Sequence, residues 1–262
     1  MPKQQSSSNP LDTFRLSLPT PAGDLQAEIS VPTSFIPVSD IVPLMRSLGE
    51  EALKLEETKV RQAGQTISCQ KGCGACCRVM VPVSPPEAFT LKKGVEQLPA
   101  PHRDRIRQRL SKVKDALNEA GLLGRLVQLS ETRTQLSDED MEPINQAYYA
   151  QRLPCIFLED ESCSIYEFRP AACREYLVTS PATFCQDMTD PAVKPVSVPF
   201  RIATVLSLMW AKLTGGPARL LPLPIALDWA DRHAEENKAY ETGSTLLEMG
   251  MEKIWGFLRQ RS

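Results

Sequence analysis

The sequence predicts a mainly α-helical protein whose helices surround an irregular cysteine core stapled by a metal, with a small β-hairpin at the N-terminal end. Three observations predict it. Apolar residues recur at helical spacing in several segments, alternating residues before position 32 flank a Pro-Ala-Gly turn, and all eight cysteines lie between positions 69 and 185. A chain of 262 residues, 42% of them hydrophobic, is long enough to bury a sizeable core without disulfides.

The first elements follow from local patterns. Residues 14–19 and 24–31 alternate polar and apolar side chains, which indicates the hairpin. Residues 40–63 carry an apolar stripe at helical spacing, so they form a helix. Ser84 and Glu87 enclose two prolines in the pattern of a capping box, which predicts that a helix over residues 85–93 begins close to Cys77.

The later segments are also predicted to be helical. The segment after residue 100 has an apolar stripe opposite many Arg and Lys side chains, typical of an amphipathic helix with a solvated basic face. The segment after Ser137 has an acidic first turn, although Pro143 counts against an unbroken helix. The segment after Arg201 is apolar on nearly every side and should be buried. These helices span residues 101–120, 137–150, 201–213, 224–237 and 242–258.

We expect three segments along the chain. Residues 1–38 form an N-terminal segment that contains the hairpin. Residues 39–190 form the cysteine-cluster metal-binding domain with a helical insertion. Residues 191–262 form a C-terminal helical segment that packs on this core, after a connector marked by three spaced prolines.

The cysteines are the most informative feature of the chain. Four of them fall within nine residues, in the stretch Cys-Gln-Lys-Gly-Cys-Gly-Ala-Cys-Cys, and four more follow between positions 155 and 185. Thiolates bind soft and borderline metals, and several on one loop can surround one ion or cluster. The candidate metal ligands are Cys69, Cys73, Cys76, Cys77, Cys155, Cys163, Cys173 and Cys185.

Three other interpretations of the cysteines are weaker, and one of them, inert buried core thiols, would suit only one or two of the later four. Four disulfides would suit a small secreted domain, but the first residues lack the basic and apolar segments of a secretory signal. Cys76 and Cys77 are adjacent, and neighbouring α-carbons lie about 3.8 Å apart, closer than is usual for a disulfide. A nucleophilic cysteine would need a base, yet His102 and His233 both lie in polar stretches and are expected at the surface.

The spacing leaves the metal open. Cys73 and Cys76 are separated by two residues, as in structural zinc sites and in iron–sulfur sites. With Cys69 they give three sulfurs from one loop, which suits a four-iron cluster and slightly favours iron–sulfur over zinc. Radical S-adenosylmethionine enzymes share this spacing, but they need strand–helix alternation where helices are predicted here. Adjacent side chains rarely point the same way, so either Cys76 and Cys77 serve different centres or one of them is only structural. Two zinc ions, one cluster with spare thiols, and a cluster plus zinc all remain open.

The second cysteine group carries a more specific pattern. A Pro-Cys pair at 154–155 is followed by Cys-Ser-Ile-Tyr-Glu-Phe-Arg-Pro-Ala-Ala-Cys-Arg at 163–174. Together with the Cys-Gly-Ala-Cys-Cys loop, it resembles the bacterial cysteine-cluster family described as zinc- or iron-chelating, of the CxxCxxCC type. The resemblance covers residues 69–185, and the chain departs from the family in having three residues between Cys69 and Cys73.

The resemblance implies that the eight cysteines are metal ligands, matched position by position, but it names no substrate. Some members of the family are labelled iron–sulfur oxidoreductases and others flagellin lysine methylases. Within the motif, Pro170 is expected to open a short helix that carries Cys173. Arg169 and Arg174 are expected to donate hydrogen bonds to cysteine sulfur or to offset thiolate charge, the alternative being surface ion pairs with Glu167 or Glu175.

Three functions from different classes remain open at this point. The preferred one is a metal-binding protein that holds an iron–sulfur cluster or zinc. The second is an iron–sulfur-dependent oxidoreductase or a protein methyltransferase that uses S-adenosylmethionine, and the third is a structural zinc module for protein interactions. The net charge of −2 argues against nucleic acid, and the apolar runs are too short for a membrane span. We therefore expect a cytoplasmic protein with a protein or small-molecule partner.

Overall fold

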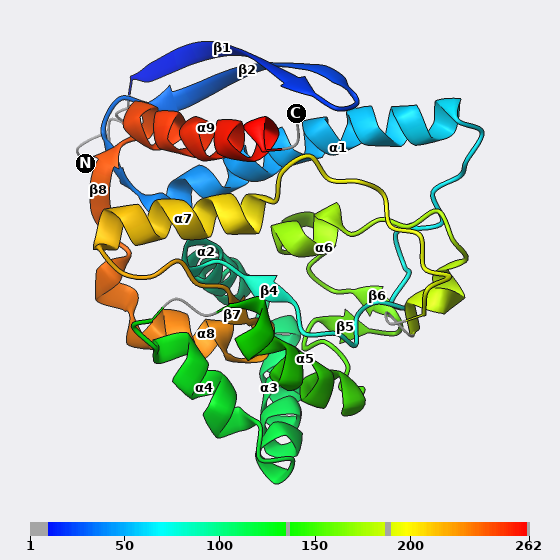
Figure 1. Cartoon of the computed structure of the whole chain (residues 1–262). Coiled ribbons are helices and arrows are strands. Elements are labelled where there is room, and N and C mark those ends of the chain that lie inside the picture. Colours follow the sequence, from blue (N-terminus) through cyan, green and yellow to red (C-terminus); the bar gives the residue numbers. More distant parts are fainter. Residues whose placement is uncertain (1–9, 135–136, 187–189, 261–262) are drawn as a thin grey trace.

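The computed structural model describes residues 10–134, 137–186 and 190–260. Within these residues the chain is mainly helical, with nine α-helices and a small N-terminal antiparallel hairpin, which confirms the predicted class and the hairpin (Figure 1). None of the described helices combines the length and the apolar character that a membrane crossing requires. The metal-stapled core stays a prediction.

The hairpin consists of β1 (Leu11–Thr20) and β2 (Gly23–Pro32), which are longer than the sequence predicted. Its register pairs Leu18 with Leu25, and both side chains are almost fully buried. The strands lie across α9 (Gly243–Arg259) and α1 (Val42–Gln62), as Figure 1 shows at the top of the molecule. The hairpin thus buries one face on the helices, which an isolated two-stranded ribbon could not do.

Five helices form the centre of the core. α2 (Pro85–Glu96) contacts both α7 (Ile202–Thr214) and α8 (Leu223–Arg232), and α7 also contacts α1 and α9. The predicted capping box of α2 is present. α7 is buried, as its apolar sequence predicted, and it ends at Gly215, whose φ of 69° closes the helix in the left-handed region.

Two short strand pairs tie distant parts of the chain to this centre. β3 (Phe35–Pro37) pairs with β8 (Ala239–Thr242), and β4 (Pro82–Val83) pairs with β7 (Leu221–Pro222). The second pair places the exit of the cysteine loop beside the start of α8. Two single-turn helices complete these connections, η1 (Val38–Ile41) and η4 (Ala234–Glu236).

The helical insertion lies at the bottom of Figure 1. It contains α3 (Ala100–Glu119), α4 (Leu123–Glu131) and α5 (Asp138–Ala150). The sequence did not predict α4, which is only nine residues long and offers a short apolar pattern. α5 begins at Asp138 rather than at Pro143, because Ser137 caps it and Asp140 closes the capping box.

The remaining elements carry the second cysteine group. They are small, and loops connect them: β5 (Leu158–Glu159), β6 (Ser162–Cys163), η2 (Tyr166–Phe168), α6 (Ala171–Glu175) and η3 (Ala182–Gln186). α6 confirms the short helix expected after Pro170. This irregular region lies at the right of Figure 1, against α1 and the insertion.

Candidate metal centre

The cysteine loop is built from two consecutive turns. The backbone N–H of Cys73 donates to the carbonyl of Gln70 at 3.1 Å, and that of Cys77 donates to the carbonyl of Gly74 at 3.0 Å. Gly72 has a φ of 93°, which a residue with a side chain rarely adopts. Small residues therefore let the chain turn twice within nine positions while four thiols project from it.

The first cysteine is fixed by the segment after α6. Ser68 donates its N–H to the carbonyl of Val178 at 2.9 Å, and Val178 donates its own N–H to the sulfur of Cys69 at 3.3 Å. A backbone donor on a cysteine sulfur offsets negative charge there, as in many thiolate sites. The entrance of the loop is thus attached to the second cysteine group.

The middle of the loop packs on the turn between β5 and β6. An added Cβ at Gly74 would lie 2.8 Å from the carbonyl oxygen of Glu161 and 2.8 Å from the side chain of Leu158. Arg78 forms two hydrogen bonds with the Glu161 carboxylate, at 2.6 and 3.1 Å, and one with the carbonyl of Gly74. Glu161 thus connects the turn to the loop, and its side chain remains 62% exposed.

The exit of the loop joins the second group directly. Cys155 donates its backbone N–H to the carbonyl of Cys77 at 2.8 Å. From α3, Arg109 donates to the carbonyl of Ile156 at 2.8 Å, and Arg105 pairs with Glu159 at 2.7 Å. The basic helix was expected to present a solvated face, but these two side chains fix the position of the strand region that carries Cys155 and Cys163.

Glu87 connects the helix after the loop to the helix that carries Cys173. Its carboxylate accepts from the N–H of Ser84 at 3.2 Å, from the N–H of Ala171 at 2.8 Å and from Arg46 at 3.4 Å. The Glu87 side chain is fully buried, and that of Arg46 is 6% exposed. A buried carboxylate needs this many partners, because desolvation of an unpaired charge costs several kcal/mol.

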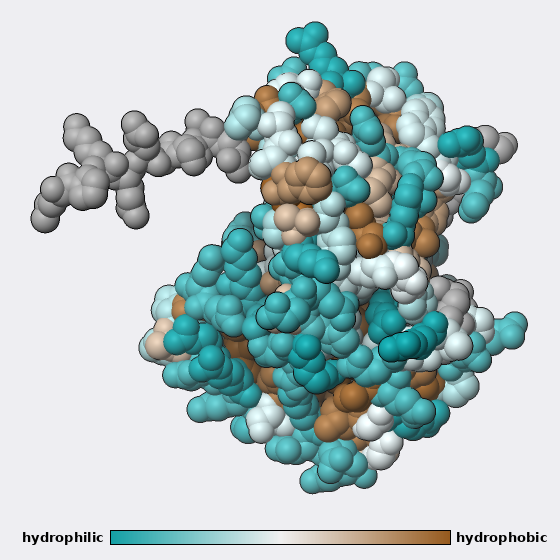
Figure 2. All heavy atoms as spheres, turned by 90° about the vertical axis from the view of Figure 1, so that its left-hand side faces the viewer, coloured by the Kyte–Doolittle hydropathy of each residue, from teal (hydrophilic) through white to brown (hydrophobic). Residues whose placement is uncertain are grey.

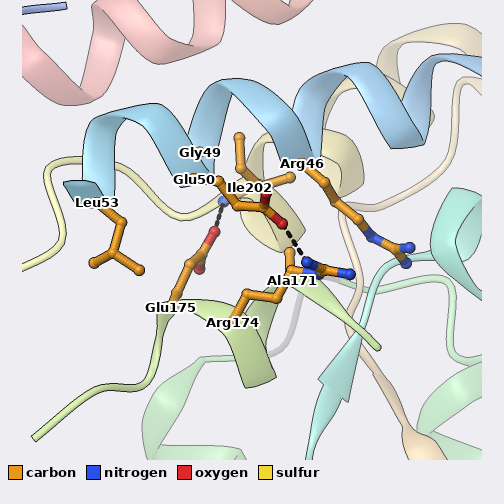
Figure 3. Close-up of a pocket in the computed structure, with 8 residues that line it drawn as sticks. All are labelled: Arg46, Gly49, Glu50, Leu53, Ala171, Arg174, Glu175 and Ile202. Atoms are coloured by element: carbon orange, nitrogen blue, oxygen red, sulfur yellow. Dashed lines mark hydrogen bonds and ion pairs between the residues drawn. The ribbon is translucent and has the colours of Figure 1, made fainter. Parts of the chain in front are cut away.

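α6 is held from its other side by α1 and α7 (Figure 3). Arg174 pairs with Glu50 of α1, and it also donates to the backbone carbonyls of Glu167 and Arg169. Glu175 accepts the N–H of Ile202 at 2.8 Å, at the start of α7. Burial raises the pKa of Glu175 to about 7. Three neighbouring elements thus fix the helix that places Cys173.

Cys76 of the loop lies within electrostatic range of thiols in the second group. A negative charge on Cys76 helps to raise the pKa of five other thiols, so these thiols lie close enough to interact with it electrostatically. They are Cys69, Cys155, Cys163, Cys173 and Cys185. Cys76 also hydrogen-bonds to the adjacent Cys77. A charge on Cys73 acts on Cys69 and Cys185. All eight cysteines are free thiols, and Cys185 is the buried one.

Six of the thiols have a raised pKa, namely Cys69, Cys76, Cys155, Cys163, Cys173 and Cys185. Burial is the main cause that raises the pKa of Cys155 to about 12 and that of Cys185 to about 11. Burial also raises the pKa of Cys173 well above its ordinary value. For Cys76 the hydrogen bond with Cys77 is the main cause and burial the second. A cation would offset the charge of these sulfurs and release their protons on binding.

The guanidinium of Arg169 acts electrostatically on four of the thiols. Its positive charge favours a lower pKa at Cys69, Cys76, Cys163 and Cys173. Burial and neighbouring thiols have larger effects, so the pKa of each of these cysteines is raised overall. The guanidinium lies 4.3 Å from the centre of the Tyr166 ring, and its buried Nε has no hydrogen-bond partner within the described residues. The charge of Arg174 also favours a lower pKa at Cys163, while its guanidinium donates to Glu50 and to backbone carbonyls.

Sequence reasoning missed several residues of this region. Tyr176 lies beside Cys185, and burial raises its pKa to about 12. Arg46, Arg78 and Glu87 act through contacts with residues far along the chain. Only Glu87 left a local signal, the capping box. His102 and His233, expected at the surface, are partly buried, and His233 lies between Glu131 and Glu236.

The donor set fits a soft or borderline metal, because sulfur dominates it and neighbouring thiols come from both chain segments. Over residues 10–134, 137–186 and 190–260, however, no three His, Cys, Asp or Glu side chains meet the geometry of a single ion site. The structure therefore places several thiols near one another, but it does not show which of them would bind the same ion or cluster.

Comparison with known families agrees with this donor set. A sequence model of the CxxCxxCC family, described as "Putative zinc- or iron-chelating domain", matches residues 68–191. This part of the chain is therefore similar to the CxxCxxCC family. The matched range contains all eight cysteines and slightly less than half of the chain. No curated protein and no solved structure matches the chain. The description of the CxxCxxCC domain leaves the metal and the physiological role open.

Proposed function

We propose that this protein binds a metal centre through the thiols of its CxxCxxCC-like segment, and that the centre is an iron–sulfur cluster rather than zinc. The observation that carries the proposal is the position of Cys76. It comes from the loop, yet its charge acts on Cys155, Cys163 and Cys173 of the second group. Thiols brought together from two distant segments, with three on one loop, suit a cluster.

The surrounding residues have defined tasks in this proposal. Arg169 offsets thiolate charge and has a free Nε donor for sulfur. The N–H of Val178 already donates to Cys69. Such outer contacts orient ligands and tune the potential of a cluster. A bound iron–sulfur cluster would supply one-electron redox chemistry. Bound zinc would instead stabilise the fold.

The test is metal content together with an absorption spectrum, on protein purified without oxygen. The proposal predicts iron and acid-labile sulfide, with a broad visible absorption that bleaches on reduction. Colourless protein with stoichiometric zinc, after attempted iron–sulfur reconstitution, would replace the cluster by a structural zinc site. Protein that takes up neither metal at the cysteines would contradict the proposal.

A second candidate is an enzyme that acts beside the centre. One observation favours it: a pocket of about 350 Å³ is lined by Thr66, Ser180 and Phe184, among other residues that flank Cys69 and Cys185 in sequence. Its size falls within the range of small-molecule sites. Calorimetry with S-adenosylmethionine on metal-loaded protein tests the methyltransferase alternative, and the absence of any binding heat would contradict it.

A further inference from the structure

A second pocket lies away from the cysteines, where the ends of α4, α7 and α8 meet β8. Its volume is about 870 Å³, within the range of ligand sites. In Figure 1 β8 lies at the left edge, which is the side that faces the viewer in Figure 2. Figure 2 shows a mainly hydrophilic face there, with scattered hydrophobic side chains. None of the eight cysteines lines this pocket.

Aromatic rings form one wall of the pocket. Trp210 of α7 and Trp229 of α8 lie 6.3 Å apart, centre to centre, and Trp210 lies 6.3 Å from Tyr240 in an edge-on arrangement. Phe89 of α2 packs behind both tryptophans, at 5.7 and 5.6 Å. The rings are therefore fixed in place before any ligand arrives, which lowers the entropic cost of binding.

Tyr240 reaches this wall because β8 is irregular. Ala239 pairs with Pro37 and Glu241 pairs with Ile36, so Tyr240 is an extra residue opposite no partner. Such a β-bulge turns a side chain away from the regular alternation, and bulges are frequent beside functional sites. The bulge therefore places the Tyr240 side chain at the aromatic wall.

The acidic groups of the pocket are already paired. Glu131 accepts from Arg232 at 2.8 Å and contacts Nε2 of His233 at 3.0 Å. Glu236 contacts Nδ1 of the same ring at 2.6 Å. Both imidazole nitrogens are thus occupied, and the ring stacks on Trp229 at 4.2 Å. This network holds the wall together and leaves no free base for a ligand.

The basic groups of the pocket are less fully occupied. Lys238 lies 5.4 Å from the Tyr240 ring and forms no ion pair within the described residues. Arg133 also lines the pocket without an ion pair in that part of the chain, whereas Arg219 donates to the carbonyls of Ser130 and Thr132. With His233 neutral, the charged side chains that line the pocket are three cations and two carboxylates, so their formal net charge is positive.

One donor of the wall also lacks a partner. Trp229 is 1% exposed, and its indole Nε1 has no hydrogen-bond acceptor among the described residues. A buried donor without an acceptor costs free energy.

We propose that the pocket binds a small planar organic anion, an aromatic ring that bears a carboxylate or a phosphate. The ring packs against Tyr240, which the buried Trp210 holds in place, and the anionic group is attracted by Lys238 and Arg133. The site is independent of the metal centre, so it does not depend on the proposed function.

The test is calorimetry on the full chain with four probes. Benzoate and adenosine monophosphate carry the anionic group as carboxylate and phosphate, and benzamide and adenosine are their uncharged counterparts. The proposal predicts that at least one anion binds with a Kd below about 1 mM and at least about tenfold more tightly than its uncharged counterpart. The anion that binds distinguishes the carboxylate from the phosphate. No binding by either anion, or equal binding by the uncharged partner, would overturn the proposal.

Variants locate the binding. Lys238→Gln should weaken binding of the anion several-fold, whereas Lys112→Gln, an exposed lysine on α3 remote from the pocket, should leave it unchanged. Tyr240→Leu should weaken the anion and its uncharged counterpart alike, because it removes the ring contact. Should Tyr240→Leu fail to fold, the two lysine variants decide. Equal affinity in Lys238→Gln and Lys112→Gln would contradict the assignment to this pocket.

Discussion

The carboxylate of Glu87 accepts a hydrogen bond from the backbone N–H of Ala171 at 2.8 Å, across 84 positions of the chain. The same carboxylate closes the capping box at the start of α2, shortly after the cysteine loop. Ala171 opens the helix that carries Cys173. One buried side chain therefore fixes the exit of the loop relative to a cysteine of the second group.

Replacement of Glu87 should destabilise the protein strongly. Glu87→Ala would leave the guanidinium of Arg46 buried without its carboxylate and two backbone donors unpaired. Breaking a buried ion pair on one side costs about 3–5 kcal/mol. Thermal melting should show the loss, and the metal content of the folded fraction should fall. The control is Glu119→Ala, an exposed glutamate at the end of α3. Equal melting of the two variants would contradict this role.

Addition of one methyl group at Gly74 should separate the loop from the turn between β5 and β6. A Cβ there would lie 2.8 Å from the carbonyl oxygen of Glu161, which is backbone and cannot move alone. Forced overpacking costs about 1–3 kcal/mol. Gly124→Ala is the matched control, because nothing lies within 4 Å of a Cβ at that helical position. Urea unfolding should show Gly74→Ala destabilised and Gly124→Ala unchanged or more stable; the reverse order would refute the contact.

Arg169 should affect the metal centre without a large effect on the fold. Arg169→Gln removes the positive charge that acts on four cysteines but keeps a polar side chain. Loss of such an outer contact typically weakens metal binding 10- to 100-fold, by about one to two orders of magnitude. Competition with a chelator measures this affinity. Arg125→Gln, an exposed arginine on α4, serves as the control and should bind metal like the wild type.

Glu131 should make stability depend on pH in the acid range. Burial raises its pKa, but hydrogen bonds and charge from Arg232 and His233 outweigh burial, so its pKa is lowered. A lowered carboxyl pKa contributes stability above the ordinary value near 4.5, and this contribution is lost as pH falls through the lowered value. The side chain is 36% exposed, so the contribution should be at most about 1 kcal/mol.

Denaturant unfolding of Glu131→Gln and the wild type as a function of pH checks this. The difference in the free energy of unfolding should be largest at neutral pH and shrink as the solution becomes acidic. Glu248→Gln, exposed on α9, should show no such dependence. A difference between Glu131→Gln and wild type that is constant across the range would exclude the ionic contribution.

Local patterns in the sequence predicted much of the fold. The capping box placed the start of α2, and the apolar sequence after Arg201 predicted a buried α7. α4 was missed because nine residues give too short a periodic signal. Pro143 argued against the first turn of α5, but the cap at Ser137 is strong enough to begin the helix there.

The candidate site was predictable in its composition but not in its arrangement. The cysteines identified the donor atoms, and the motif drew attention to Arg169 and Arg174. Sequence alone could not show that Arg169 lies among the thiols while Arg174 turns to Glu50, because both contacts depend on the path of α6 against α1. Long-range contacts leave no local pattern, and for the same reason Glu87 was predicted only as a cap.

The central claim is that both cysteine groups serve a common centre. Metal per folded chain, measured on anaerobically purified wild type, Cys76→Ser and Cys155→Ser, tests it most directly. A common centre predicts that either substitution, one in the loop and one in the second group, removes or strongly reduces the same metal and the same absorption. If Cys155→Ser retained the full metal content and spectrum while Cys76→Ser lost them, the loop alone would bind the metal and the account would be contradicted.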